Sequence, residues 1–306
     1  MPRPFSIAKG AAFLASGLIC AGAWGGAFDF TAADADAAYR AAAGLVRDCT
    51  PRNAGTPGGL RAAAWLRDRA RAAGIPAKLD VFTAPVNDGQ GRFANVVAEI
   101  PGTDPQAPWV VLMSHFDTAP NVAPGFEGAN DGASTSGLLL ALGAAVRRAK
   151  PARLNLLLAW TDAEECRVAY GPRDGFQGSR RLLRYLQDRV RPVRAAICLD
   201  MLGDRDLDII MPANSDSGLV RLALKAAKTA GLERIRLRGD IAVKDDHSAF
   251  YDAGIPALDL IDFTYGSAPG MNDYWHTPKD TLDKISRASL LASGRLAAEL
   301  LGALMQ

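Results

Sequence analysis

One stretch of the chain, residues 154–165 with the sequence LNLLLAWTDAEE, limits what the rest can fold into. Its apolar run has almost no polar interruption, which is typical of a strand buried on both faces of a sheet. The run continues without a turn signal into Asp162, Glu164 and Glu165. Ligands of open α/β sheets bind beyond the carboxyl ends of the strands. Acids crowded there repel one another unless a cation compensates them, so the stretch favours a metal site; the alternative is a solvated acidic turn.

Strand-like and helix-like segments alternate along the remaining chain. Helices are expected at 32–48, 58–73, 134–148, 179–190, 218–230 and 286–305, and further strands at 78–82, 95–100, 109–113, 195–199, 207–211 and 255–261. Such alternation predicts an α/β fold in which helices cover both faces of a mostly parallel sheet. The chain contains no internal repeat and no linker that would divide it, so residues 28–306 are predicted to form one domain.

The N-terminus has the layout of a secretory signal peptide. Arg3 and Lys9 precede a short apolar run at 11–23 that ends in small residues, and cleavage is expected after Ala23 or Ala27. Residues 1–27 are therefore expected to direct the protein to the periplasm or the exterior, with an uncleaved N-terminal anchor as the alternative. The run is short for a transmembrane helix, so no stable membrane span is expected.

Charge and cysteine content bear on whether the protein binds nucleic acid and whether disulfides hold it together. A formal net charge of +2 over 306 residues, without a basic stripe, argues against a nucleic-acid partner. The mature chain would retain Cys49, Cys166 and Cys198, and an odd number is not the pattern of a disulfide scaffold. Cys166 and Cys198 are expected near strand ends as buried thiols, with a disulfide between adjacent strands as the alternative.

Histidines and acids converge at the same predicted edge of the sheet. Five of them are expected there: His115, Asp131, Glu165, Asp200 and His276. Imidazole and carboxylate ligands around an open coordination position are typical of catalytic zinc. Five such residues also suffice for two ions that share one carboxylate. Asp117, two residues after His115, is expected to accept a hydrogen bond from the other ring nitrogen of His115.

Five ordered motifs resemble those of peptidase family M28, which includes zinc aminopeptidases and glutaminyl cyclases. They are residues 114–118 (SHFDT), 128–134 (GANDGAS), 162–165 (DAEE), 199–201 (LDM) and 276–278 (HTP), and the resemblance runs from about Pro51 to the end of the chain.

The resemblance implies a mixed central sheet flanked by helices, with Asp131 as the ligand that two metals share. Glu165 and His276 would complete a first site, and His115 and Asp200 a second. Glu164 would be the general acid/base. The resemblance also implies a cis peptide bond between Asp131 and Gly132.

Three features resemble the glutaminyl cyclases in particular: the loop at 170–180, the Asp245-Asp246-His247 motif, and Trp275 before His276. Tyr170 stands where the animal enzymes place tryptophan, and Asp259 where they place histidine. Tyr170 and Trp275 are expected to contact substrate, and packing at the rim of the core is the alternative for both. Asp245 and its neighbour are alternatively helix-capping acids.

The resemblance predicts a zinc enzyme, with one or two ions, that acts on the N-termini of peptides or proteins. The favoured activity converts N-terminal glutamine to pyroglutamate and releases ammonia, with Asp200 and Asp245 positioning Glu164 through short hydrogen bonds. The alternative is an aminopeptidase in which two metals activate a water that Glu164 deprotonates. A non-catalytic binding domain is a third possibility, against which Glu164 and the five ligands argue.

Overall fold

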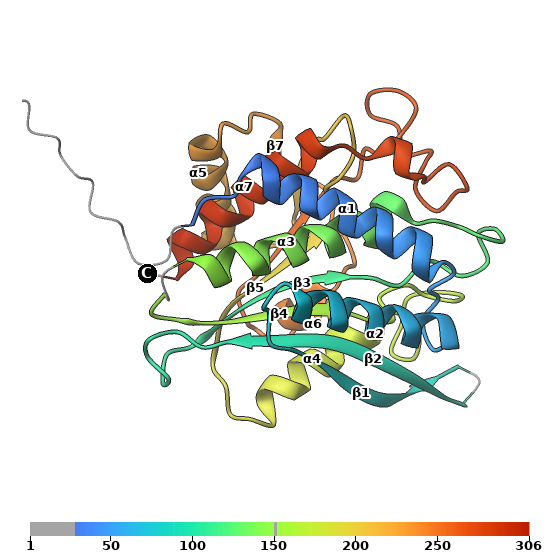
Figure 1. Ribbon diagram of the computed structural model, residues 1–306, viewed down its shortest axis with the longest axis horizontal. Coiled ribbons are helices and arrows are strands. Elements are labelled where there is room, and N and C mark those ends of the chain that lie inside the picture. Colours follow the sequence, from blue (N-terminus) through green and yellow to red (C-terminus); the bar gives the residue numbers. More distant parts are fainter. Residues whose placement is uncertain (1–27, 88, 150–151, 306) are drawn as a thin grey trace, which may run out of the picture.

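The computed structural model describes residues 28–87, 89–149 and 152–305, and the predicted signal peptide lies outside these residues. Their central feature is one eight-stranded sheet with helices packed on both faces (Figure 1). Among the described helices, none combines the length and hydrophobicity that a bilayer-crossing segment requires. The predicted single α/β domain is confirmed.

The sheet is mixed, with its parallel strands at the centre. Its strands are β1 (Ala77–Val86), β2 (Gly89–Ile100), β3 (Trp109–His115), β4 (Asn155–Thr161), β5 (Val193–Asp200), β6 (Ile209–Pro212), β7 (Ile235–Arg238) and β8 (Ala257–Ile261). They are ordered β1-β2-β4-β3-β5-β8-β6-β7. Strands β4, β3, β5 and β8 run parallel, β6 and β7 form a further parallel pair at one edge, and β1–β2, β2–β4 and β6–β8 are antiparallel pairs. The carboxyl ends of four central strands therefore meet at one edge.

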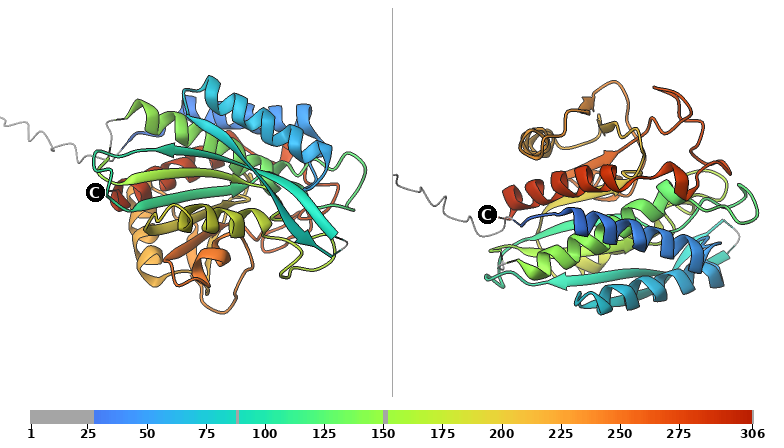
Figure 2. Two further views of the ribbon diagram at one scale, coloured as in Figure 1. Left: turned by 90° about the horizontal axis from the view of Figure 1, so that it is seen from below. Right: turned by 45° about the horizontal axis from the view of Figure 1, so that its top comes forward.

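Two helical layers enclose the sheet (Figure 2). One layer contains α1 (Ala32–Cys49), α2 (Pro57–Ala72), α3 (Thr135–Arg148), α5 (Ser217–Ala230) and α7 (Arg287–Leu304), and the other contains α4 (Gln177–Gln187) and α6 (His247–Tyr251). Two short helical turns, η1 (Ala129–Ser134) and η2 (Leu282–Lys284), complete the fold.

The period of two in β3 explains how one strand serves both layers. Val110 and Leu112 pack in the core beneath α1, α3 and α7, whereas Val111 and Met113 pack beneath α4 and α6. Every residue of β3 and of β4 is buried. Such strands need apolar side chains on both faces, which is why these segments are recognisable as near-continuous apolar runs.

Local sequence signals define several helix ends. Thr31 caps α1 in a capping box with Asp34, and Thr56 caps α2 directly before Pro57. At the other end of the chain, Ser286 caps α7 by accepting from the backbone N–H of Ser289. These caps place the helices within about two residues of the predicted boundaries.

The outer strands depart most from the prediction. β1 and β2 form a long antiparallel pair that extends well beyond the expected segments, and β7 was not predicted. β1 alternates between buried and exposed positions and β7 has no fully buried residue, so neither has the apolar run of a central strand.

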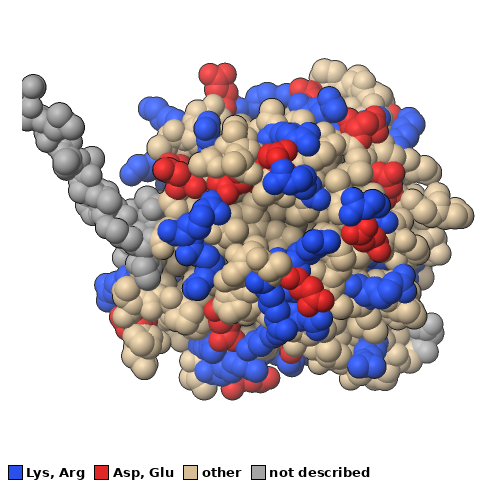
Figure 3. Space-filling model, in the orientation of Figure 1, with Lys and Arg blue, Asp and Glu red and all other residues tan. Residues whose placement is uncertain are grey.

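On the face of the molecule seen in Figure 3, Lys and Arg side chains are interspersed with Asp and Glu side chains.

Candidate active site

The ends of adjacent parallel strands place the predicted metal ligands together. His115 is the last residue of β3, Asp200 is the last residue of β5, and Glu165 follows β4 by four residues. Asp131 lies in η1, which leads from the β3 loop into α3, and His276 lies in the loop between β8 and α7. The structure thus brings together all five side chains from different segments of the chain.

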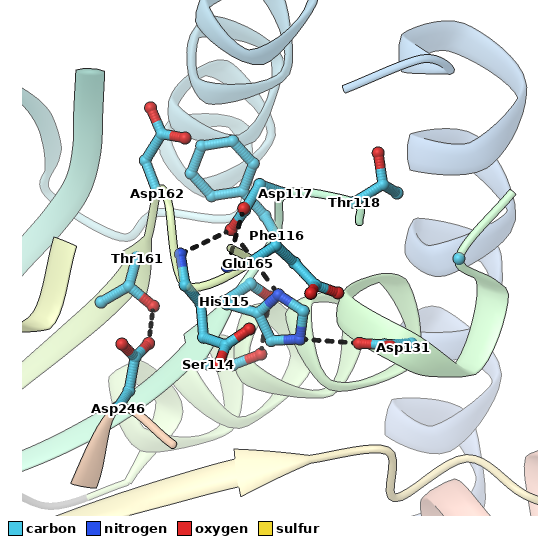
Figure 4. A network of polar contacts seen from close by, with 12 residues as sticks. Ser114, His115, Phe116, Asp117, Thr118, Asp131, Thr161, Asp162, Glu165 and Asp246 are labelled. Carbon is cyan, nitrogen blue, oxygen red and sulfur yellow. Dashed lines mark hydrogen bonds and ion pairs between the residues drawn. The ribbon is translucent and has the colours of Figure 1, made fainter. Parts of the chain in front are cut away.

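Asp131 lies at the centre of this group. Its Oδ1 is 3.0 Å from His115 Nε2, and its Oδ2 is 3.3 Å from His276 Nε2. His276 Nε2 is also 3.1 Å from Glu165 Oε1, and His115 Nε2 is 3.2 Å from Asp200 Oδ1. Figure 4 shows the ring of His115 between Asp117 and Asp131. Each carboxylate oxygen of Asp131 therefore faces a different imidazole, as a ligand shared by two positions would.

The predicted cis peptide bond at Asp131–Gly132 is wrong. Within the described residues the cis bond is Thr50–Pro51, and the bond after Asp131 is trans. The backbone turns here because Gly132 adopts a φ of 84°. A Cβ at Gly132 would lie 2.9 Å from the carbonyl oxygen of Asp117, so glycine permits both the turn and the close approach.

Three ligand-bearing turns contain a non-glycine residue in the left-handed region. Ala163 precedes Glu164 with φ 58°, Met201 follows Asp200 with φ 54°, and His276 itself has φ 52°. Such conformations are unfavourable for residues with a Cβ and persist where the surrounding structure constrains them. Their location in three segments that carry ligands of this group is consistent with a functional site.

Asp117 holds the turn after β4, although not as predicted. Its carboxylate oxygens each accept a backbone N–H at 3.2 Å, one from Glu164 and one from Glu165. The distance from Asp117 Oδ1 to His115 Nδ1 is 3.6 Å, too long for the expected hydrogen bond. The carboxylate is drawn away from the ring because the two N–H groups are buried and need an acceptor.

The charges of this group shift one another's pKa values. Burial would lower the pKa of His276, but its contacts with Asp131 and Glu165 raise it to about 10. Burial, together with the charge of Asp131, raises the pKa of Glu165 to about 7. The pKa of Asp131 is below its ordinary value: burial opposes this shift, and His115 and His276 cause it.

The donor set fits a metal ion. One nitrogen or oxygen atom from each of His115, Asp131 and Glu165 lies within 4.8 Å of the others. Asp131 Oδ2 is buried and accepts no hydrogen bond from any residue that the structure describes. Imidazole nitrogens and carboxylate oxygens are the ligands of catalytic zinc, and a cation there would favour the ionised form of each carboxylate.

The expected trio of Glu164, Asp200 and Asp245 is not a directly hydrogen-bonded one. Asp200 contacts His115, and Asp245 Oδ1 accepts from the backbone N–H of Asp246 and from the thiol of Cys198 at 3.4 Å. Among the described residues no hydrogen bond links these groups to Glu164. Burial raises the pKa of Glu164 well above its ordinary value, and the charges of Glu165 and Asp245 add to this effect.

The neighbours of Asp245 resolve two open alternatives. Asp246 occupies the N-cap position of α6 without capping it, and its carboxylate accepts from Thr161 (Figure 4). Cys198 is a buried free thiol, as predicted. Cys166 is also free but only half-buried, so the two cysteines form no disulfide.

A cavity of about 350 Å³ opens beside the metal ligands. Glu164 and Asp245 line it together with the rings of Tyr170, Phe263 and Trp275. The ring of Tyr170 stacks on Phe176 and its hydroxyl donates to Glu165 at 3.4 Å, and Trp275 stacks on His276. Both predicted substrate residues thus pack on neighbours and also present a face to the cavity.

Two supporting residues were missed by sequence reasoning. Arg52 is fully buried and donates to the carbonyl oxygens of Phe116 and Gly128, both at 2.6 Å. Asp280, four residues after His276, accepts from the backbone N–H of Asn130. The only signals for them were the short segments in which they occur, the PRNAG turn and the sequence after HTP, because their partners are distant in the chain.

Comparisons with known proteins agree with this geometry. The model of the family described as Peptidase family M28 matches residues 95–301. The glutaminyl-peptide cyclotransferase-like protein of Bos taurus is 29% identical over 269 residues, which are 75% of this chain and 66% of that protein. This chain therefore spans slightly less than two thirds of its length.

Two solved structures share the fold over nearly their whole length. The glutaminyl cyclase of an Acidobacteriales bacterium has a TM-score of 0.81 and 33% identity, covering 89% of this chain and 95% of that one. A leucine aminopeptidase precursor from Bacteroides thetaiotaomicron has a TM-score of 0.74 and 25% identity, covering 90% and 98%. The family match includes every metal-site side chain described above, and this chain belongs to peptidase family M28.

Proposed function

We propose that this protein is a zinc-dependent glutaminyl-peptide cyclotransferase, which converts the N-terminal glutamine of peptides to pyroglutamate and releases ammonia. The observation that supports it most is the composition of the cavity. Glu164, with its raised pKa, and Asp245 line the cavity beside the metal ligands, and aromatic rings form other parts of its wall. The similarity to the Acidobacteriales glutaminyl cyclase and to the bovine cyclotransferase-like protein supports the same proposal.

Asp131, Glu165 and His276 would hold the zinc, whose contribution is to polarise the carbonyl of the substrate's side-chain amide. The substrate's own amine forms the new C–N bond to that carbon, and the bond to the amide nitrogen breaks. Because both reacting groups belong to one residue, the protein mainly needs to orient them. The aromatic walls of the cavity suit that task by limiting the conformations of the bound side chain.

Glu164 would carry the proton from the attacking amine to the departing ammonia. A carboxyl group does this best when its pKa lies near the working pH, and burial together with the charge of Glu165 raises the pKa of Glu164. Asp245 adds negative charge nearby, and its own pKa is raised to about 6 by burial and by the charge of Asp200. A proton is therefore retained among these groups at neutral pH.

A metallo-aminopeptidase is the second candidate, and one specific observation favours it. His115 lies within 3.2 Å of both Asp131 and Asp200, which would form a second metal position that shares Asp131. In that case the metals would supply the activation of a water, Glu164 would take its proton, and the acidic cavity would hold the substrate's amine. The Bacteroides leucine aminopeptidase precursor has the same fold.

One incubation separates the two activities. The purified chain is supplied with amidated peptides that begin with Gln or with Leu, and ammonia, free amino acids and peptide length are followed. The cyclotransferase releases ammonia from Gln peptides and leaves them full length. Release of free glutamine, or faster turnover of the Leu peptides, would identify an aminopeptidase instead.

For the location of the protein, we propose secretion or export to the periplasm through residues 1–27. N-terminal sequencing of the mature protein tests this proposal, and an intact N-terminus would indicate an anchor.

A further inference from the structure

An exposed lysine lies at the mouth of the cavity. Five buried acids line the interior, whereas Lys244 lines the same cavity and is exposed. Of the lining residues, only Ala242 and Lys244 are exposed, so they mark the side that opens to solvent. Both belong to the loop between β7 and α6, directly before Asp245.

Lys244 has no acid to neutralise it within the described part of the chain. Two basic residues near it are paired with acids: Arg238 with Asp240 at 2.8 Å, and Lys279 with Asp273 at 3.3 Å. The ammonium group of Lys244 forms no ion pair and no hydrogen bond with any described residue. An unpaired lysine at the entrance of a binding cavity attracts an anionic group on whatever occupies the mouth.

The deeper acids do not cancel this attraction. They are buried in the interior, whereas Lys244 is exposed at the mouth, and the zinc of the proposed function would neutralise part of their charge. In that function the N-terminal glutamine fills the interior, and the peptide must leave through the exposed side. The side chain of the second residue is then the first substrate group to reach the mouth.

We propose that Lys244 is a specificity-determining residue that selects peptides with an acidic side chain directly after the N-terminal glutamine. The proposal rests on the cyclotransferase function and adds the substrate class to it. An exposed ion pair is worth little, so the expected preference for Glu over the isosteric Gln at the second position is about two- to five-fold in kcat/KM. The pair is present both before and during the reaction, so the difference appears in KM while kcat stays constant.

The test compares amidated peptides that begin Gln-Glu, Gln-Gln and Gln-Lys, with ammonia release as the measurement. Wild type should prefer them in that order, and the preference should shrink as salt is added. Lys244→Ala should remove the preference and Lys244→Glu should reverse it. Lys225→Glu on α5 makes the same change in net charge at an exposed site away from the cavity and should leave the preference intact.

The outcomes separate this proposal from the function on which it rests. Equal kcat/KM for all three peptides in wild type, or an unchanged preference in Lys244→Ala, overturns the role of Lys244 while ammonia release still supports the cyclotransferase. Loss of the preference in Lys225→Glu as well would assign it to overall charge and overturn the role of Lys244. Absence of ammonia from every Gln peptide overturns the cyclotransferase function and the Lys244 proposal together.

Discussion

The carboxylate of Asp280 holds the backbone of the central metal ligand Asp131, accepting its N–H at 3.1 Å and the N–H of Asn130 at 2.7 Å. Asp117 does the same for Glu164 and Glu165 on the other side of the site. Each buried carboxylate thus satisfies two successive N–H groups of a turn that presents a ligand. Asp280 also lies on the loop that carries His276, so it links two ligand-bearing segments.

Replacing Asp280 should therefore weaken metal binding more than it unfolds the chain. We expect Asp280→Ala to lower zinc affinity by about 10- to 100-fold, as other partners that orient metal ligands do. Asp280→Asn, which keeps one acceptor, should lose less. Zinc affinity is measured by competition with a chelator, and the melting temperature of the metal-free protein is measured in parallel.

Tyr265→Phe is the matched control for Asp280. It removes a hydroxyl that donates to Asp280 Oδ1 at 2.7 Å but leaves both backbone contacts in place. Zinc affinity close to wild type is expected for this variant. If Asp280→Ala loses thermal stability while its zinc affinity matches that of Tyr265→Phe, the carboxylate supports the fold and not the ligand.

The metal dependence of the enzyme should follow His276. Chelation should abolish activity and added zinc should restore it, because Asp131, Glu165 and His276 form a charged cluster that fits a cation. His276→Ala should lose the metal, measured as zinc per chain after dialysis. A His276→Ala variant with full zinc content and the wild-type rate would contradict the assignment of His276 as a metal ligand.

Glu164→Gln should separate proton transfer from metal binding. The change keeps the size of the side chain but removes the group that carries the proton, so turnover should fall by at least ~10²-fold. Zinc content should be largely retained, because Glu164 makes none of the short contacts with His276 that Glu165 makes. Glu165→Gln is the comparison and should lose zinc; equal loss in both variants would mean that the two roles are exchanged.

Asp245→Ala should impair pyroglutamate formation while zinc remains bound. Asp245 lines the cavity beside Glu164, and its charge helps to keep the pKa of Glu164 high. Without that charge the pKa of Glu164 falls, so Glu164 is a weaker base toward the attacking amine. The acidic limb in the pH profile of kcat should therefore move to lower pH in Asp245→Ala, and a limb that stays in place or moves to higher pH would contradict this cause.

Zinc should stabilise the protein more as the pH rises from about 5 to about 8. In the metal-free protein the pKa of Glu165 is raised from 4.5 to about 7 and that of His276 from 6.5 to about 10, so both keep protons that zinc must displace. Both values lie above those of the unfolded chain. The stability that these groups contribute to the metal-free form is therefore complete below pH 4.5 and 6.5 and is lost as the pH rises through about 7 and 10.

The measurement is the difference in melting temperature between zinc-loaded and metal-free protein across this pH range. Glu165→Gln, which is expected to lose zinc, should show little difference in melting temperature at any pH. A difference that stays constant with pH in wild type would show that neither proton is linked to zinc binding.

The central sheet and the chemistry of its edge were determined by the sequence itself. β3 and β4 are buried on both faces, so each had to be an apolar run, and the ligands His115 and Glu165 end or follow those runs. Side-chain type and order along the chain are enough to predict a metal site when ligands sit at the ends of parallel strands, because topology brings those ends together.

Only the tertiary structure decided what surrounds the ligands. Arg52 and Asp280 act on backbone groups at least 64 and 149 residues away, and no local pattern records a contact of that range. The trans bond after Asp131, the contact of Asp245 with Cys198 and the exposure of Lys244 at the mouth depend likewise on how separate segments pack. Sequence periodicity reports which face of an element is buried, whereas these features depend on which element lies opposite.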